Sequence, residues 1–186
     1  GISFEANHPY LQFQQHLRAL AGLTANDPPQ AVREGIDRLV AALPVAARTA
    51  AESSLARLLA AEGKAEQAER DRADGDGEAF KRQLFAAMTA IWQGQAEAGP
   101  WVCLFDDLHW ADAASVELLV HLLHLLESHP ILFICVFRPD RAAPGWRLHE
   151  EARTTYSQHS TLLELRPLDE AESQTLVDNL LAMTSL

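Results

Sequence analysis

Two runs of apolar residues constrain the fold of this chain more than any other part of its sequence. They are WVCLF at 101–105 and ILFICVF at 131–137, and each is apolar at every position. Such runs are typical of strands in parallel sheets that helices cover on both faces. A helical pattern at about 113–128 separates them, and a strand-like run, TLLEL at 161–165, precedes a helical pattern at about 170–182. This alternation predicts an α/β fold with a layered parallel sheet.

Helical patterns account for most of the first hundred residues. Apolar side chains at helical spacing predict helices at about 9–20, 30–42, 47–61 and 77–97, separated by prolines and glycines. The charged stretch at 62–77 is predicted to end in an exposed loop. Later in the chain, Asp112 is placed to cap the helix that follows it, and Asp169 with Glu172 resembles a capping box for the last helix.

The overall charge argues against two classes of partner. The 186 residues carry 15 basic and 26 acidic side chains, a formal net charge of −11. Such a surface repels nucleic acids and anionic membranes, so this segment is not expected to contact either. No apolar run reaches the roughly 20 residues of a membrane span, and the start lacks a signal core, which predicts a cytoplasmic location. Cys103 and Cys135 are predicted to be buried, with neither a disulfide nor a metal.

Two carboxylates follow the first apolar run directly. Asp106 and Asp107 fall at the carboxyl end of the predicted strand, which is where open parallel sheets bind ligands. Adjacent carboxylates at such a place are costly unless a cation or a donor meets them. A magnesium ion that bridges phosphate oxygens is one suitable partner, and the second carboxylate would then orient a water molecule. The plainer alternative is that an aspartate at a strand end caps a turn.

The longer string around these carboxylates is more specific. FDDLHWADAASVELLVHLL, followed by a strand that ends in FRPD, closely resembles the AAA-type ATPase domain of large bacterial signalling proteins. This group of P-loop ATPases includes domains of LuxR-type and MalT-like transcriptional regulators and of some adenylate cyclases. The resemblance makes the first apolar strand with its aspartates a Walker B motif. It implies that Asp106 helps to hold Mg²⁺ through water and that Asp107 orients or activates the attacking water.

The same resemblance assigns three further residues. Arg138, at the end of the next strand, matches the sensor arginine near the terminal phosphate of ATP. The alternative is a turn arginine that pairs with Asp140. His109 and Trp110 belong to the matched string and are expected to shape the loop without acting chemically.

The resemblance also covers the flanking segments. EANHPYLQFQQHLRAL is similar to the segment after the family's second strand, and LELRPLDEAESQTLVDNLL is similar to the entry of its helical lid. It therefore implies a partial P-loop NTPase core at 1–168, with a three-layer parallel sheet and a helical insertion at about 30–98. The start of a helical lid would follow at 169–186.

The phosphate loop of this family is missing from the sequence. Its form is G-x-x-x-x-G-K-[ST], and neither Lys64 nor Lys81 has the required neighbours. We therefore expect the chain to be a fragment, with ISFE at 2–5 as the tail of a strand that follows the loop upstream. In the family, the strand before the loop lies beside the last strand, so 161–165 would have no obvious neighbour and two strand edges would be exposed. The chain alone is predicted neither to bind ATP tightly nor to hydrolyse it.

Two functions remain open from the sequence. The first is part of a regulatory ATPase domain that hydrolyses ATP with Mg²⁺, is coupled to other domains of a larger regulator and can form a homo-oligomer. The second is a non-catalytic protein-interaction module that has lost the phosphate loop. A further candidate, the stripe of Glu117, His121 and His124 on one helix face, is interpreted as the face that is not buried and not as a metal site.

Overall fold

The computed structural model describes residues 9–24, 26–60 and 77–183. The α-helices are α1 (Leu11–Leu20), α2 (Pro29–Ala41), α3 (Val45–Ala60), α5 (Gly77–Ala98), α6 (Ala113–Leu122), α7 (Gly145–Thr154) and α8 (Glu170–Met183). The strands are β1 (Trp101–Phe105) and β2 (Ile131–Cys135), and the short 3-10 helices are η2 (Leu108–Trp110), η3 (Leu123–Glu127) and η4 (Ser157–His159). The predicted helices are confirmed to within a few residues, except that the helix predicted at about 113–128 ends at Leu122 and is followed by the 3-10 helix η3. The predictions for 2–5 and 62–76 lie outside the described residues.

Local signals explain where several helices begin. α2 starts at Pro29, a residue whose fixed backbone angle suits the first helical position. α6 has Asp112 as its predicted N-cap, and the Asp169–Glu172 capping box forms at the start of α8. Arg166 also pairs with Glu172, and this contact lowers the pKa of the Glu172 carboxyl. None of the described helices combines the length and the apolar character needed to cross a bilayer.

The two predicted apolar strands pair in parallel. The register runs from Trp101 opposite Ile131 to Phe105 opposite Cys135, and α6 with η3 forms the connection between the strands. The second strand was predicted to reach residue 137, but regular pairing ends at Cys135 because β1 ends at Phe105. The parallel pairing inferred from the apolar runs is confirmed within the part of the chain that the structure describes.

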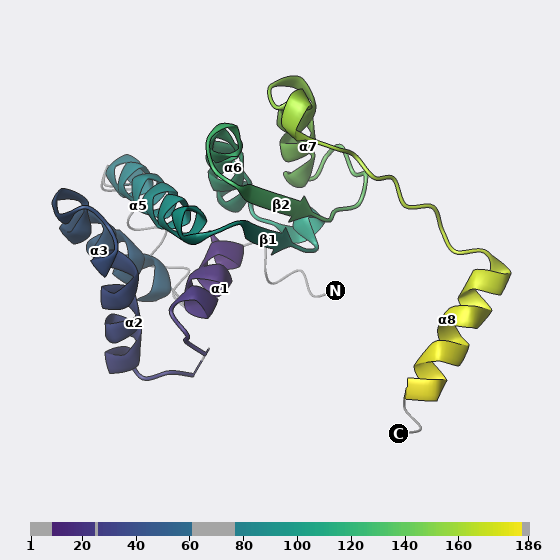
Figure 1. Cartoon of the computed structure of the whole chain (residues 1–186), viewed down its shortest axis with the longest axis horizontal. Coiled ribbons are helices and arrows are strands. Elements are labelled where there is room, and N and C mark those ends of the chain that lie inside the picture. The colour runs from purple at the N-terminus through teal and green to yellow at the C-terminus, as the bar shows by residue number, and fades with distance from the viewer. Residues whose placement is uncertain (1–8, 25, 61–76, 184–186) are drawn as a thin grey trace.

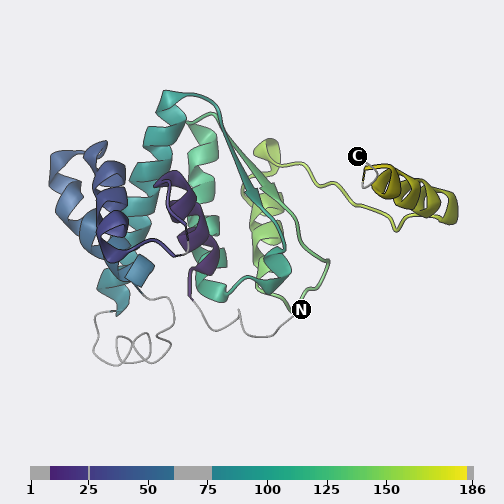
Figure 2. The ribbon, with the colours of Figure 1, turned by 90° about the horizontal axis from the view of Figure 1, so that it is seen from below.

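Aromatic side chains fill the space between the sheet and the helices. Trp92 of α5 is fully buried, and its ring lies 5.4 Å from that of Phe133 and 6.0 Å from that of Phe105. Phe13 of α1 packs against the same Phe105 ring at 5.6 Å. Figures 1 and 2 show α1, α5 and α6 together on one side of the strands. This packing explains why α5, within the expected insertion, is part of the domain core.

The opposite face of the sheet is exposed among the described residues. Strand side chains alternate between the two faces, and those on the uncovered face are 42–58% exposed. They are Val102 and Leu104 of β1 and Leu132 and Ile134 of β2, together with Val136 just after β2. The prediction that helices cover both faces is therefore wrong for this part of the chain, which has one helical layer on a two-stranded sheet. The three-layer arrangement is not present in these residues.

The third predicted strand is also wrong. Residues 160–169 have no regular structure, and Leu162, Leu163 and Leu165 are exposed. A strand exists only where its backbone groups pair with a neighbour, and the described residues offer this segment none. The segment instead leads to α8, which stands apart from the other helices in Figure 1. An apolar pattern such as that of 161–165 favours a strand, but it does not supply the neighbouring strand with which it must pair.

Cys103 and Cys135 lie on the covered face of adjacent strands. Both thiols are free, and burial raises the pKa of each to about 12. The neighbouring Cys135 adds to the shift of Cys103. Because thiolates are the reactive form, these two cysteines are chemically quiet core residues.

Candidate functional site

Two backbone hydrogen bonds at the end of β1 leave Asp106 and Asp107 outside the regular pairing of the sheet. The Val136 amide donates to the Phe105 carbonyl at 2.9 Å, and the Leu108 amide donates to the Val136 carbonyl at 2.9 Å. Asp106 and Asp107 lie between these two anchored positions. Since both bonds involve Val136, the two aspartates form a short loop at the carboxyl end of the strand. The structure thus places them where the sequence predicted, outside the end of a parallel strand.

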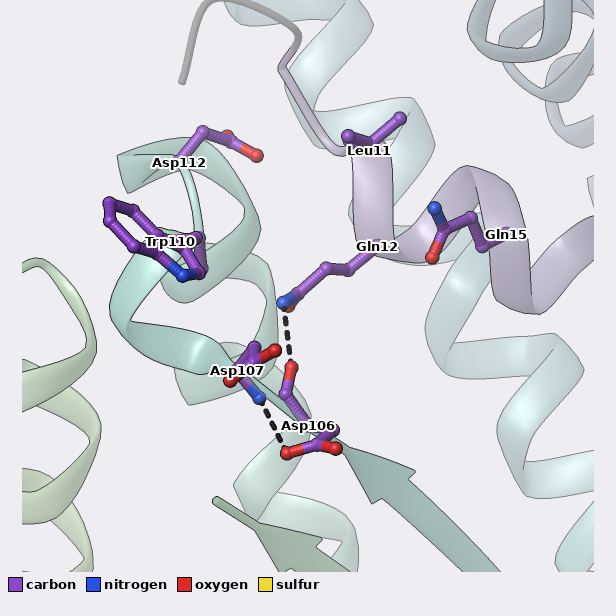
Figure 3. Close-up of a pocket in the computed structure, with 8 residues that line it drawn as sticks. Leu11, Gln12, Gln15, Asp106, Asp107, Trp110 and Asp112 are labelled. Carbon is purple, nitrogen blue, oxygen red and sulfur yellow. Dashed lines mark hydrogen bonds between the residues drawn. The ribbon is translucent and has the colours of Figure 1, made fainter. Parts of the chain in front are cut away.

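The two aspartates have different local conformations. The Asp107 amide donates to Oδ1 of Asp106 at 2.8 Å, which orients the first carboxylate. Asp107 itself has φ 56° and ψ 34°, the left-handed region that few residues other than glycine adopt. Its side chain is 70% exposed. Both aspartates are exposed residues, and Figure 3 shows their side chains beside the end of the strand.

Helix α1 reaches this loop from the other end of the sequence. Nε2 of Gln12 donates to the Asp106 carbonyl at 3.4 Å, a long hydrogen bond between residues 94 positions apart. The Tyr10 amide donates to Oδ1 of Asp112 at 3.2 Å. Figure 3 shows the Gln12 side chain pointing from α1 toward the aspartates. The N-terminal end of α1 is thereby held against the loop from 106 to 112.

A hollow of about 230 Å³ lies between α1 and this loop. Its lining consists of Leu11, Gln12, Gln15, Asp106, Asp107, Trp110, Ala111 and Asp112. Sites for whole small molecules usually measure about 300–1,000 Å³, so this hollow suits a part of a ligand, such as an ion or one phosphate. The α1 residues were not predicted as site residues, because no local pattern shows that positions 11–15 meet position 106.

The chemistry of the lining fits a hard cation. It contains three carboxylates and two amide side chains, and none of these described lining residues is basic. Magnesium is usually held by one or two carboxylates together with water and substrate phosphates, and rarely by a cage made only of protein ligands. In keeping with this, the described residues contain no cluster of three or more His, Cys, Asp or Glu that could hold a metal alone. Asp106 has one carboxylate oxygen engaged and is exposed, so it can take part in such a site.

Arg138 lies at the same edge of the sheet but outside the hollow. It follows β2 by three residues and is exposed, and its carbonyl accepts from the Asp140 amide at 2.7 Å. The predicted alternative, an ion pair between Arg138 and Asp140, is absent from the described residues. Asp140 instead accepts from the Ala142 amide at 2.9 Å. The contact of Arg138 with a terminal phosphate stays a prediction.

The two loop residues after the aspartates differ in their surroundings. Trp110 lines the hollow and is half exposed, whereas the His109 side chain is only 10% exposed. The two rings lie 4.9 Å apart. Nδ1 of His109 lies 3.7 Å from Oδ1 of Asp107. The sequence led us to expect that both residues shape the loop, but it gave no sign that a buried imidazole faces the second carboxylate.

The histidine stripe on α6 lies along α5. Glu117 pairs with Lys81 of α5 at 2.7 Å, and His121 contacts Oγ1 of Thr89 at 3.3 Å. Partial burial lowers the pKa of His121, and the adjacent His124 adds to the shift. Of the three stripe residues, His121 is exposed and the other two are half-buried. The stripe was interpreted as the face of the helix that is not buried, and this is only partly right: it is less buried than the rest of α6, but two of its residues are half-buried because it contacts α5.

Comparisons with known proteins place a family model over most of the chain. The model of the AAA ATPase domain matches residues 5–134. An uncharacterized protein of Rhizobium meliloti (strain 1021) is 26% identical over 111 residues, which are 60% of this chain and 10% of that protein. The chain therefore spans about a tenth of the length of this relative. No solved structure matches the chain.

Proposed function

Because the chain belongs to the AAA ATPase domain family, we propose that it is part of a regulatory ATPase domain that hydrolyses ATP to ADP and phosphate with Mg²⁺. One observation carries the proposal. Asp106 and Asp107 directly follow the end of a parallel strand and line a hollow to which five residues with side-chain oxygens contribute: Gln12, Gln15, Asp106, Asp107 and Asp112. That is the place and the chemistry that a metal-bound phosphate requires.

The two carboxylates would take separate roles. Asp106 would hold the magnesium ion through water, since its carboxylate is oriented by the Asp107 amide and still has free lone pairs. When bound, the ion neutralises charge that develops on the transferred phosphate. Asp107 would orient the attacking water and accept its proton, because its carboxylate is 70% exposed and is fixed only through its backbone.

Two further parts complete the proposed site. Arg138 is exposed at the same edge of the sheet, from which its guanidinium would meet the terminal phosphate. The phosphate loop is not among the 186 residues, so the proposal requires that the full-length gene product supply one. Coupling of hydrolysis to other domains of a larger regulator, and assembly into a homo-oligomer, belong to the same proposal.

Substitution of the second aspartate tests the proposed reaction. In the full-length gene product, Asp107→Asn removes the group that orients and deprotonates water but leaves the backbone donor to Asp106 in place. We expect ATP hydrolysis to fall by about a hundred-fold or more, with the dissociation constant for Mg-ATP nearly unchanged. Steady-state hydrolysis and equilibrium binding of a labelled nucleotide are measured together.

Asp140→Asn is the matched control for this experiment. Asp140 is an exposed aspartate at the same edge of the sheet, and an asparagine there can still accept from the Ala142 amide. This variant should hydrolyse ATP at the normal rate. A wild-type protein that neither binds nor hydrolyses ATP would overturn the proposal and favour the non-catalytic interaction module. Equal activity of Asp107→Asn and wild type would remove Asp107 from the reaction.

A further inference from the structure

Unsatisfied polar atoms gather beside the carboxylate pair. Four side-chain atoms in the described residues are shielded from solvent and lack a hydrogen-bond partner: Nε1 of Trp92, Oε1 of Gln12 and both ring nitrogens of His109. Three of these four atoms belong to the two residues that flank Asp106 and Asp107. A buried polar group without a partner is costly, so a cluster of them indicates a functional constraint.

Of Gln12 and His109, His109 gives the stronger evidence for a functional role, because both of its ring nitrogens lack a partner. Its side chain is 90% buried, and Nδ1 lies 3.7 Å from Oδ1 of Asp107. That separation is too long for a hydrogen bond, which needs about 2.7–3.2 Å. A movement of the carboxylate by roughly 1 Å would therefore bring the two groups together. The Asp107 side chain is free to make this movement because it is mostly exposed.

The backbone that carries His109 is held firmly. The Leu108 amide is bonded to Val136 at 2.9 Å, and the Trp110 amide donates to the Asp107 carbonyl at 2.9 Å. α7 packs so closely that a Cβ on Gly145 would lie 2.8 Å from the Leu108 carbonyl oxygen. The imidazole is therefore the fixed partner, and the carboxylate is the one that turns.

We propose that His109 is a positioning residue whose Nδ1–H donates to the Asp107 carboxylate and sets its orientation toward the attacking water. The inference rests on the proposed ATPase function, which it deepens. With one carboxylate oxygen taken by the imidazole, the other oxygen points in a defined direction for the water. The hydrogen bond also satisfies one of the orphaned ring nitrogens, so closure of the contact is favourable for the folded protein.

Two substitutions of His109 separate the hydrogen bond from the shape of the ring. His109→Phe keeps a buried ring and removes the donor. His109→Asn places an amide nitrogen near the position of Nδ1 and keeps a donor. In the full-length gene product, we expect His109→Phe to lower kcat by about ten- to a hundred-fold while Mg-ATP binding is unchanged. His109→Asn should restore much of that loss, which a purely structural role would not explain.

A double substitution shows whether His109 acts through Asp107. If it does, adding His109→Phe to Asp107→Asn should lower the residual rate by less than two-fold, because the group to be positioned is already lost. If His109→Phe lowers the rate by the same factor in the wild type and in Asp107→Asn, the proposal is overturned. His109 would then support the fold without positioning Asp107.

The tautomer of His109 gives a readout that does not depend on activity. We expect ¹⁵N spectra of the histidine-labelled chain, under alkaline conditions where imidazoles are neutral, to place the proton of His109 on Nδ1. Asp107→Asn should change this ring signal, and Asp140→Asn should not. An unchanged His109 signal in Asp107→Asn would overturn the inference even if the protein is an ATPase. A shifted signal in a protein without ATPase activity would keep the contact and reject the proposed function.

Discussion

Asp112 shows how a single residue joins distant parts of the chain. Its Oδ1 accepts from the Ser115 amide at 2.8 Å, which caps α6, and from the Tyr10 amide at 3.2 Å, which precedes α1. Oδ2 accepts from the Ser115 hydroxyl at 2.6 Å. The same carboxylate therefore accepts hydrogen bonds from amides at the N-terminal ends of both α1 and α6. Tyr10 and Asp112 are 102 positions apart in the sequence. The sequence predicted the first of these roles, and the second appears only in the folded chain.

Removal of this carboxylate should destabilise the chain more than loss of an ordinary cap. We expect Asp112→Ala to lower the free energy of unfolding by about 1–3 kcal/mol, since two backbone donors lose their acceptor. Ser115→Ala, which removes only the hydroxyl bond, should cost about 1 kcal/mol or less. Urea denaturation of the two variants and of the wild type measures both values. Similar stability of Asp112→Ala and wild type would contradict the joint role.

At the scale of elements, the placement of the carboxylates depends on how α7 meets η2. Gly145, at the start of α7, approaches the backbone of Leu108, and Leu108 directly follows Asp107. A side chain at position 145 would meet a carbonyl group and not the flexible end of a side chain. The contact between Gly145 and Leu108 thus supports the loop that carries the aspartates, and it requires a glycine at position 145.

Two glycine substitutions compare this contact with an ordinary helical position. Alanine favours helix over glycine by about 1 kcal/mol, so Gly94→Ala in α5, with open space around the new Cβ, should stabilise the chain slightly. Gly145→Ala gains the same helix propensity, but its Cβ meets the Leu108 backbone. We therefore expect the free energy of unfolding to fall by about 1–3 kcal/mol. Thermal unfolding measures both shifts. A higher Tm for Gly145→Ala than for wild type would show that the contact relaxes easily.

At the scale of the whole molecule, the described residues bury one face of the sheet and leave the other open. The covered face carries the aromatic cluster around Trp92, while the open face presents Leu104 and Leu132 to solvent. A contiguous apolar surface of this kind promotes association between molecules. The sequence led us to expect exposed strand edges, and the described residues also expose one whole face of the sheet.

Polar substitutions on the open face should reduce this association without unfolding the chain. Threonine keeps a high preference for strands, so Leu104→Thr with Leu132→Thr should change stability by about 0.5 kcal/mol or less per site. We expect the double variant to stay monomeric at concentrations where the wild-type chain associates in sedimentation velocity. Phe105→Thr, on the covered face, should instead destabilise by about 3 kcal/mol or more. Equal association of the double variant and the wild type would show that another surface is responsible.

Much of the local structure could be predicted because its causes are local. The helices, the parallel pairing of the two apolar runs and both capping signals follow from periodicity and from residues three positions apart. The resemblance of FDDLHWAD and its neighbours to AAA-type ATPase domains is confirmed by the family match. The strand expected at 161–165 failed because strand formation depends on a neighbour that no local pattern reveals. The roles of Asp106, Asp107 and Arg138 stay predictions.

The sequence by itself determined most of the helices, the pair of parallel strands and the position of the carboxylate pair at a strand end. These follow from short-range pattern and from the chemistry of the side chains present. The class of ligand that such a pair suits stays a prediction. Only the tertiary structure decided that Gln12 reaches Asp106, that Asp112 joins α1 to α6, and that the buried ring of His109 faces Asp107. Each of those contacts depends on how helices and loops pack in space, and such packing is set by the whole core and not by any local pattern.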